Sequence, residues 1–239
     1  MTVKAGAPSS SSLRRLLGVA AAAAILLLAA CGKGGDGEKG ATASHSQKAA
    51  AAALAPLEKT FAALQETVLN NPEDTVSRVY LARHYIRAAG ALRAAEEKAV
   101  FFAMADHEAG IALGLAPGDR NVRRLYGETA ILSRDFSRAM RVFEDLVYED
   151  LEGKSAEDSG ILFGLYVLQQ NVDRGILFFR TKLKRAPESM DARYLLGLLH
   201  ALAGDRRIAA GHLKVLAEKP STPAGMRAVS RKLAQELDR

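Results

Sequence analysis

The sequence has little of the chemistry on which most enzyme sites depend. It contains one cysteine, Cys31, so no disulfide forms within the chain and no thiolate cluster can hold a metal. The five histidines lack the spacing of a metal-binding motif, and no phosphate-binding glycine loop, dinucleotide-binding glycine pattern or Gly-x-Ser-x-Gly sequence occurs. Because of these absences, an enzyme is the least favoured of the functions considered. We expect no metal, no cofactor and no small-molecule substrate.

No segment alternates apolar and polar residues over the length of a strand, which argues against a sheet. What is present instead is helical periodicity, broken by short turns that contain Gly, Pro, Asn or Asp. An early example is an apolar helix face formed by Leu57, Phe61, Leu64 and Val68. This helix should end at Asn70-Asn71-Pro72. The sequence therefore predicts an all-α fold.

The first 30 residues have the composition of a secretory signal peptide. Lys4, Arg14 and Arg15 form a basic start without any acidic residue, and an apolar stretch follows from Leu16 to Ala30. A membrane-spanning helix needs about 20 apolar residues, and this stretch is shorter. We expect residues 1–30 to be a cleaved signal peptide; Arg14-Arg15 also leaves twin-arginine export open.

The stretch Leu28-Ala29-Ala30-Cys31 resembles the lipobox of bacterial lipoproteins. The resemblance implies cleavage before Cys31, lipid attached covalently to Cys31, and anchoring to a membrane. By the sorting rule of enteric lipoproteins, Gly32 after the cysteine permits transport to the outer membrane. The resemblance thus leads us to expect the outer membrane of a Gram-negative cell envelope, with the protein facing the periplasm. An uncleaved anchor or a free buried thiol is the alternative. Residues 31–48, polar and rich in glycine, then read as a flexible tether.

Charge is distributed unevenly along the chain. Three Lys or Arg and no acidic residue lie in residues 1–30, so their removal lowers the formal net charge from +6 to +3 and weakens the case for nucleic-acid binding. Residues 31–179 then hold 17 basic and 21 acidic residues, whereas residues 180–239 hold 13 and 6. The basic final third is either a contact surface for an anionic partner or an ordinary solvated face.

Two segments of the helical part, 123–146 and 193–216, are alike when Gly127 is aligned with Gly197. Ala139 then matches Ala209, and residues 160–187 fit between the two segments with Gly164 in the same register. The three glycines are expected where helices approach closely. In the turns, Asp135 and Asp205 are expected to cap the helices that follow.

This pattern resembles the tetratricopeptide repeat, whose period is 34 residues, against spacings of 37 and 33 between the three glycines. The resemblance implies that residues 49–239 form a helix-pair solenoid of about three to four repeats, after an N-terminal helix. Thr222 should cap the final helix, and its apolar stripe should contain Met226, Val229, Leu233 and Leu237. An irregular helical bundle is the alternative. The expected repeats are 75–119, 120–153, 157–189 and 190–222, followed by a capping helix at 223–238.

Tetratricopeptide domains bind an extended peptide or a partner helix on their concave side. The resemblance therefore implies a protein or peptide partner, and a scaffold in envelope assembly or secretion. The alternative function is binding of an anionic envelope polymer or lipid headgroup by the basic final third. By the register of that resemblance, the residues expected on the concave face include Arg83, Arg87, Arg124, Glu128, Gln169, Tyr194 and Leu198.

Overall fold

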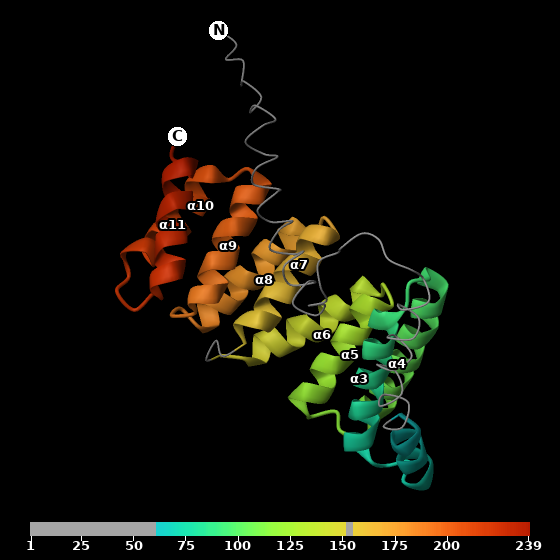
Figure 1. Cartoon of the computed structure of the whole chain (residues 1–239). Coiled ribbons are helices and arrows are strands. Elements are labelled where there is room, and N and C mark those ends of the chain that lie inside the picture. Colours follow the sequence, from blue (N-terminus) through green and yellow to red (C-terminus); the bar gives the residue numbers. More distant parts are fainter. Residues whose placement is uncertain (1–60, 152–154) are drawn as a thin grey trace. The chain divides into compact units, whose positions relative to one another are not determined.

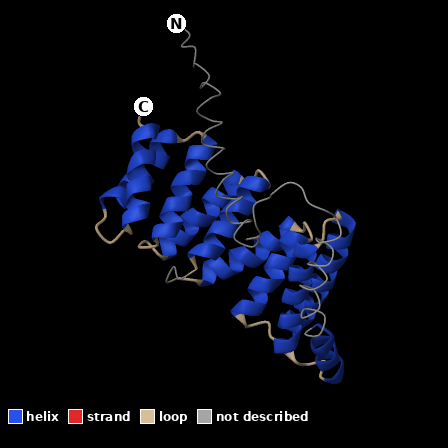
Figure 2. Ribbon diagram, viewed as in Figure 1, coloured by secondary structure: helices blue, strands red, loops and turns tan. Residues whose placement is uncertain are grey.

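The computed structural model describes residues 61–151 and 155–239 of the chain. These ranges contain helices and short turns and no strand, so the fold is all-α (Figures 1 and 2). Residues 61–70 are helical, and the helix ends at Asn70 as predicted. The helices that follow are α3 (Thr75–Ala91), α4 (Ala95–Leu115), α5 (Arg120–Leu132), α6 (Phe136–Glu149), α7 (Ala156–Leu168), α8 (Val172–Arg185), α9 (Met190–Ala203), α10 (Arg206–Glu218) and α11 (Ala224–Leu237).

The described residues form two compact units, 61–142 and 143–239, whose boundary falls within α6. In the first unit, α4 packs against both α3 and α5. Phe61 and Leu64 lie against a buried cluster that contains Leu81, Tyr85 and Ala105. The helical spacing of Phe61, Leu64 and Val68 in the sequence thus places one face of this first helix on α3 and α4.

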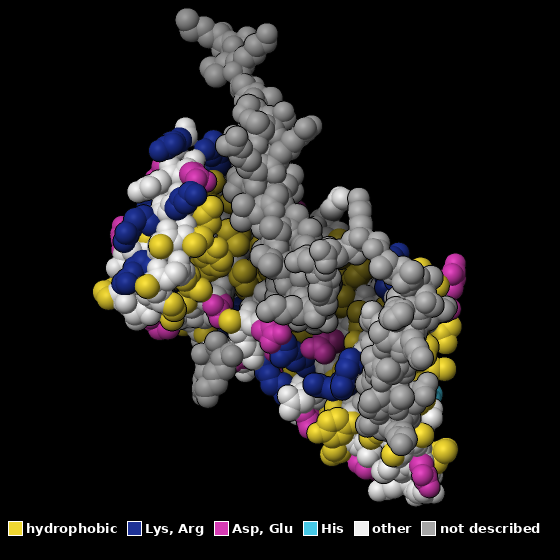
Figure 3. Space-filling view, viewed as in Figure 1, with side chains coloured by type: hydrophobic (Ala, Val, Ile, Leu, Met, Phe, Trp, Pro, Cys, Tyr) yellow, Lys and Arg dark blue, Asp and Glu magenta, His cyan; other side chains and the backbone are white. Residues whose placement is uncertain are grey.

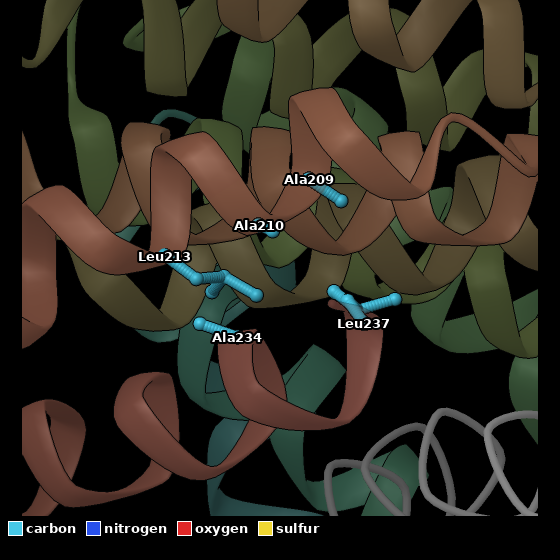
Figure 4. Packing of buried hydrophobic residues seen from close by; sticks show 5 residues of the cluster. All are labelled: Ala209, Ala210, Leu213, Ala234 and Leu237. Atoms are coloured by element: carbon cyan, nitrogen blue, oxygen red, sulfur yellow. The ribbon is translucent and has the colours of Figure 1, made fainter. Parts of the chain in front are cut away.

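In the second unit, α9 packs against α8 and α10, and α11 packs against α10. The α10–α11 contact consists mainly of small side chains with two leucines (Figure 4). Ala209, Ala210 and Leu213 come from α10, and Ala234 and Leu237 come from α11. Burial of such apolar surface is worth roughly 25 cal/mol per Å². The last helix is therefore held by the core and covers the α10 face that would otherwise be open.

Most turns between the described helices belong to two recurring types, and the described residues of the α3–α4 and α6–α7 connections belong to neither. In the first type, one residue takes the left-handed conformation: Arg134 (φ 61°), Gln170 (φ 54°) or Gly204 (φ 90°). The next amide then donates to a carbonyl five positions back, which is the longer hydrogen bond of the Schellman motif. The three bonds are Asp135 N to Ala130 O at 2.8 Å, Asn171 N to Tyr166 O at 2.8 Å and Asp205 N to His200 O at 2.9 Å. They connect α5 to α6, α7 to α8 and α9 to α10.

In the second type, proline is the second residue of a four-residue turn, where its fixed φ is favourable. The fourth amide donates to the first carbonyl: Asp74 N to Asn71 O at 3.1 Å, Asp119 N to Ala116 O at 3.1 Å, Ser189 N to Ala186 O at 3.0 Å and Thr222 N to Lys219 O at 3.1 Å. Asp74, Asp119 and Ser189 then cap α3, α5 and α9 with side-chain oxygens. The prolines are Pro72, Pro117, Pro187 and Pro220.

The prediction that Thr222 caps α11 is wrong. Pro223 takes the cap position, α11 begins at Ala224, and the buried hydroxyl of Thr222 has no hydrogen-bond partner among the described residues. The predicted apolar stripe is also wrong at Val229, which is 47% exposed. Ser230 and Ala234 are buried instead, because their small side chains let α11 lie close to α10.

The glycines aligned by the repeat pattern do not share one role. A Cβ on Gly197 would lie 3.2 Å from Leu213 Cγ, so α9 and α10 approach closely there, as predicted. A Cβ on Gly164 would meet nothing within 4 Å, and the prediction is wrong at that position. The tightest glycine position described in the second unit is Gly175 of α8, where a Cβ would lie 2.9 Å from Tyr166 Cδ2 and 3.0 Å from Leu199 Cδ1. Gly175 therefore fixes how close α8 comes to α7 and α9.

Candidate functional site

The predicted partner-binding residues of the first unit lie on α3 and α5. Arg83 and Arg87 are exposed on α3. Arg124 and Glu128 lie one helical turn apart on α5, half-buried, with Nε of Arg124 3.2 Å from Oε1 of Glu128. A pair of this kind contributes about 0.3–0.5 kcal/mol to a helix. The two arginines on α3 are thus accessible, whereas Arg124 already has a carboxylate.

The other predicted residues lie in the second unit. Gln169 is exposed at the C-terminal end of α7. Tyr194 and Leu198 are half-buried on α9, and Tyr194 packs against the α10–α11 cluster. Burial raises the pKa of the Tyr194 hydroxyl. Tyr194 therefore contributes to the helix packing of this unit, in addition to any surface that it offers.

Sequence reasoning did not find two polar clusters, each of which joins three successive helices. In the first, Arg138 of α6 reaches Asp106 of α4 with Nη2 at 2.9 Å from Oδ1 and 3.0 Å from Oδ2. Its Nη1 donates to the hydroxyl of Tyr126 on α5 at 3.1 Å. Thr129 of α5 donates to the same Asp106 carboxylate at 2.8 Å. One carboxylate on α4 thus receives donors from both α5 and α6.

The second cluster joins α6, α7 and α8 around Glu144. Oε1 of Glu144 accepts from the Tyr166 hydroxyl at 2.5 Å and from Nε of Arg174 at 2.8 Å, while Oε2 accepts from Nη2 of Arg174 at 2.6 Å. Tyr166 is fully buried. Burial, and then the hydrogen bond to Glu144, raises the pKa of Tyr166, while the same carboxylate raises the pKa of Arg174. The cluster is thus a two-pronged Arg–carboxylate pair over a buried tyrosine.

Lys182 is a buried lysine whose ammonium group is used inside the fold. Its Nζ donates to the carbonyl oxygens of Val147, at a short distance, and of Asp150 at 2.8 Å. These carbonyls lie at the C-terminal end of α6, where helical carbonyls have no partner within the helix and a cation is favourable. Lys182 therefore links α8 to the end of α6.

A cavity of about 350 Å³ lies between α8, α9 and α10. His200 and His212 stack at its edge, with ring centroids 5.9 Å apart and an interplanar angle of 13°. Nδ1 of His200 lies 3.0 Å from Oδ2 of Asp205. Burial lowers the pKa of His212, and the neighbouring His200 and Arg193 lower it further. The lining residues are Arg180, Leu183, Lys184, Leu196, His200, Ile208 and His212.

No group of three His, Cys, Asp or Glu residues in residues 61–151 and 155–239 is placed to hold a metal ion. In those same ranges, no helix has the length and apolar character needed to cross a membrane. The expected signal peptide, Cys31, the tether at 31–48 and residues 49–60 lie outside the described residues.

No known family model matches this chain, and none of the curated proteins matches its sequence significantly.

Proposed function

We propose that this chain is a lipid-anchored, non-catalytic scaffold of the tetratricopeptide type that binds a protein or peptide partner in the bacterial cell envelope. The observation that carries the proposal is the recurrence of the two turn types. Left-handed turns recur at Arg134, Gln170 and Gly204, and their spacing of 36 and 34 residues is close to the period of the family. From Gln170 onward they alternate with the proline turns at Pro187 and Pro220.

The internal charges support a scaffold as well. Asp106 and Glu144, two acids that could otherwise act as proton donors or acceptors, each bind an arginine of the next helix pair. Arg138 and Arg174 both lie four residues after a left-handed turn residue. Their side chains therefore connect successive helix pairs in the same way. This use of charge stabilises the packing of one helix pair on the next, which can present side chains to a partner.

The proposed anchor is the lipid on Cys31. Cells that express the full chain should incorporate labelled palmitate into it, and Cys31→Ser should abolish the incorporation because no other cysteine is available. The Ser variant is also expected to move from the membrane fraction to the periplasmic fraction. Palmitate incorporation into Cys31→Ser would contradict the proposed anchor.

The scaffold proposal predicts a protein partner. Affinity purification of the lipidated chain after cross-linking in cells should recover the same protein or proteins in repeated experiments. A tagged, unrelated lipoprotein is the control, because it shares the anchor and lacks the helical domain. Failure to recover any protein above that control would contradict the scaffold function.

The second candidate function is binding of an anionic envelope polymer or lipid headgroup by the basic final third. Lys and Arg side chains lie over α11 (Figure 3), where Arg227 and Arg231 line a cavity of about 630 Å³. Lys214, Glu218 and Asp238 line it as well, and Nζ of Lys214 lies 2.7 Å from Oδ2 of Asp238, so the two arginines carry the positive charge offered to a ligand. Sedimentation of the chain with peptidoglycan or anionic vesicles should then weaken as salt rises, since exposed charges are screened beyond about 10 Å at 0.1 M salt. Binding that is absent, or that salt leaves unchanged, would exclude this function.

A further inference from the structure

The cavity between α8, α9 and α10 occupies the place that the Glu144 cluster has one helix pair earlier. The left-handed turn residues supply the register. Glu144 lies ten residues after Arg134, and Arg180 lies ten residues after Gln170. Tyr166 lies four residues before Gln170, and His200 lies four residues before Gly204. Arg174 lies four residues after Gln170, and Ile208 lies four residues after Gly204.

The three equivalent side chains have different chemistry at the later junction. The carboxylate of Glu144 is replaced by the guanidinium of Arg180, the tyrosine by His200, and Arg174 by Ile208. The ion pair that joins α6 to α8 therefore has no counterpart between α8 and α10. Arg180 is exposed, and the described part of the chain provides it with no carboxylate. A cationic group thus remains where the earlier junction has a complete pair.

The lining of the cavity is cationic and apolar. Arg180 and Lys184 of α8 supply positive charge, and no Asp or Glu is among the lining residues. Leu183, Leu196 and Ile208 supply apolar wall. The carboxylate of Asp205 is close by, but it lies 3.0 Å from Nδ1 of His200 and orients that ring. Within the described residues, the site therefore combines a guanidinium without a carboxylate partner, two imidazoles and an aliphatic surface.

We infer that this cavity binds the carboxylate of an aspartate or glutamate side chain from the partner, with Arg180 as its main ligand. The guanidinium of Arg180 gives the carboxylate two parallel hydrogen bonds, as Arg174 does for Glu144. The apolar wall takes up the methylene groups of the acidic side chain. The volume is at the low end of the 300–1,000 Å³ typical of ligand pockets, which suits one side chain and its flanks. This inference rests on the proposed scaffold function and names the chemistry that its partner presents.

The histidines of the full chain allow a direct test by nuclear magnetic resonance. The probe is an N-acetylated hexapeptide of glycine and leucine that contains two glutamates; the same peptide with two glutamines is the control ligand. We expect the glutamate peptide to shift the ring signals of His200 and His212 saturably. The signals of His84 and His107, which belong to the other unit, should stay in place. The glutamine peptide should shift none of the four.

Arg180→Glu places a carboxylate at the position that corresponds to Glu144, and it should lower the affinity for the glutamate peptide at least tenfold. Arg207→Glu, an equal charge change at an exposed arginine that does not line the cavity, should leave affinity within about twofold. The inference is overturned if His200 and His212 do not shift, if both peptides shift them equally, or if the two variants behave alike. Inorganic phosphate that competes as well as the glutamate peptide would also overturn it, in favour of a small-anion site.

Partner capture separates the two proposals. If cross-linking recovers a partner with the wild-type chain and much less with Arg180→Glu, both proposals are supported. Equal recovery with both chains overturns the cavity assignment and leaves the scaffold function standing. Recovery of no partner with either chain overturns the scaffold function itself.

Discussion

Gly175→Ala tests the packing of the second unit at its most crowded described glycine. The added Cβ would lie 2.9 Å from Cδ2 of Tyr166 and 3.0 Å from Cδ1 of Leu199, closer than carbon atoms normally approach. Both neighbours are fully buried. The ring of Tyr166 is held in addition by its hydroxyl, which donates to Glu144 at 2.5 Å. The ring therefore cannot move away without lengthening that bond.

Two effects of opposite sign decide the result. Replacing a glycine inside a helix with alanine stabilises the helix by about 1 kcal/mol. Overpacking a dense core costs about 1–3 kcal/mol, and the rigid tyrosine places this site in the upper part of that range. We therefore expect Gly175→Ala to lower the free energy of unfolding by about 1–2 kcal/mol. For a chain of this size, the midpoint of thermal unfolding should fall by about 2–8 °C.

Urea and thermal unfolding, followed by circular dichroism at 222 nm, measure the change. Gly164→Ala and Gly211→Ala are matched controls, because a Cβ at either position meets nothing within 4 Å. Both should raise the free energy of unfolding by up to about 1 kcal/mol. A Gly175→Ala variant as stable as these controls would show that Tyr166 is not packed against α8 as described.

Three further predictions concern the buried polar groups. Glu144→Gln should lower the free energy of unfolding by about 1–2 kcal/mol, since Arg174 is half exposed and solvent replaces part of the pair; an unchanged urea midpoint would contradict the cluster. Lys182→Met should cost about 2–3 kcal/mol in the same assay, because it leaves two carbonyls at the end of α6 without their donor; a neutral effect would contradict that role. As the pH falls from 7 to 5, the free energy of unfolding of the wild-type chain should decrease relative to that of His212→Gln, because the folded state holds the pKa of His212 below 6.5 and the unfolded state therefore binds more protons. Parallel pH profiles of the two chains would contradict the lowered pKa of His212.

Local signals in the sequence predicted the helices. Tertiary contacts decided features that these signals missed, such as which aspartates cap the helices. Asp135 and Asp205 occupy the same position after a left-handed residue, and both were predicted to cap the next helix. Asp135 does so, with Oδ1 3.0 Å from the amide of Arg138. The prediction is wrong for Asp205, whose side chain makes no capping bond and lies against His200 instead. The other repeat has Ala130 where His200 lies, so no competing side chain is present there.

The polar clusters could not be predicted from the sequence for a related reason. Arg138 and Asp106 are 32 residues apart, and Arg174 and Glu144 are 30 apart. No local period joins such residues, and charged side chains at these positions read as a solvated helix face. A search at a fixed offset from the turns finds both arginines, but only the helix packing shows which carboxylates they reach.

Photo-cross-linking in living cells tests the central claim most directly. A photoreactive amino acid replaces one residue at a time in the full chain. Arg87 and Gln169 are exposed positions on the predicted binding face, and Leu183 lines the cavity between α8, α9 and α10. Illumination should yield a discrete adduct with the same envelope protein from at least one of the three positions, identified by mass spectrometry. If illumination yields no protein adduct from any of the three positions, the account of this chain as a partner-binding scaffold is contradicted.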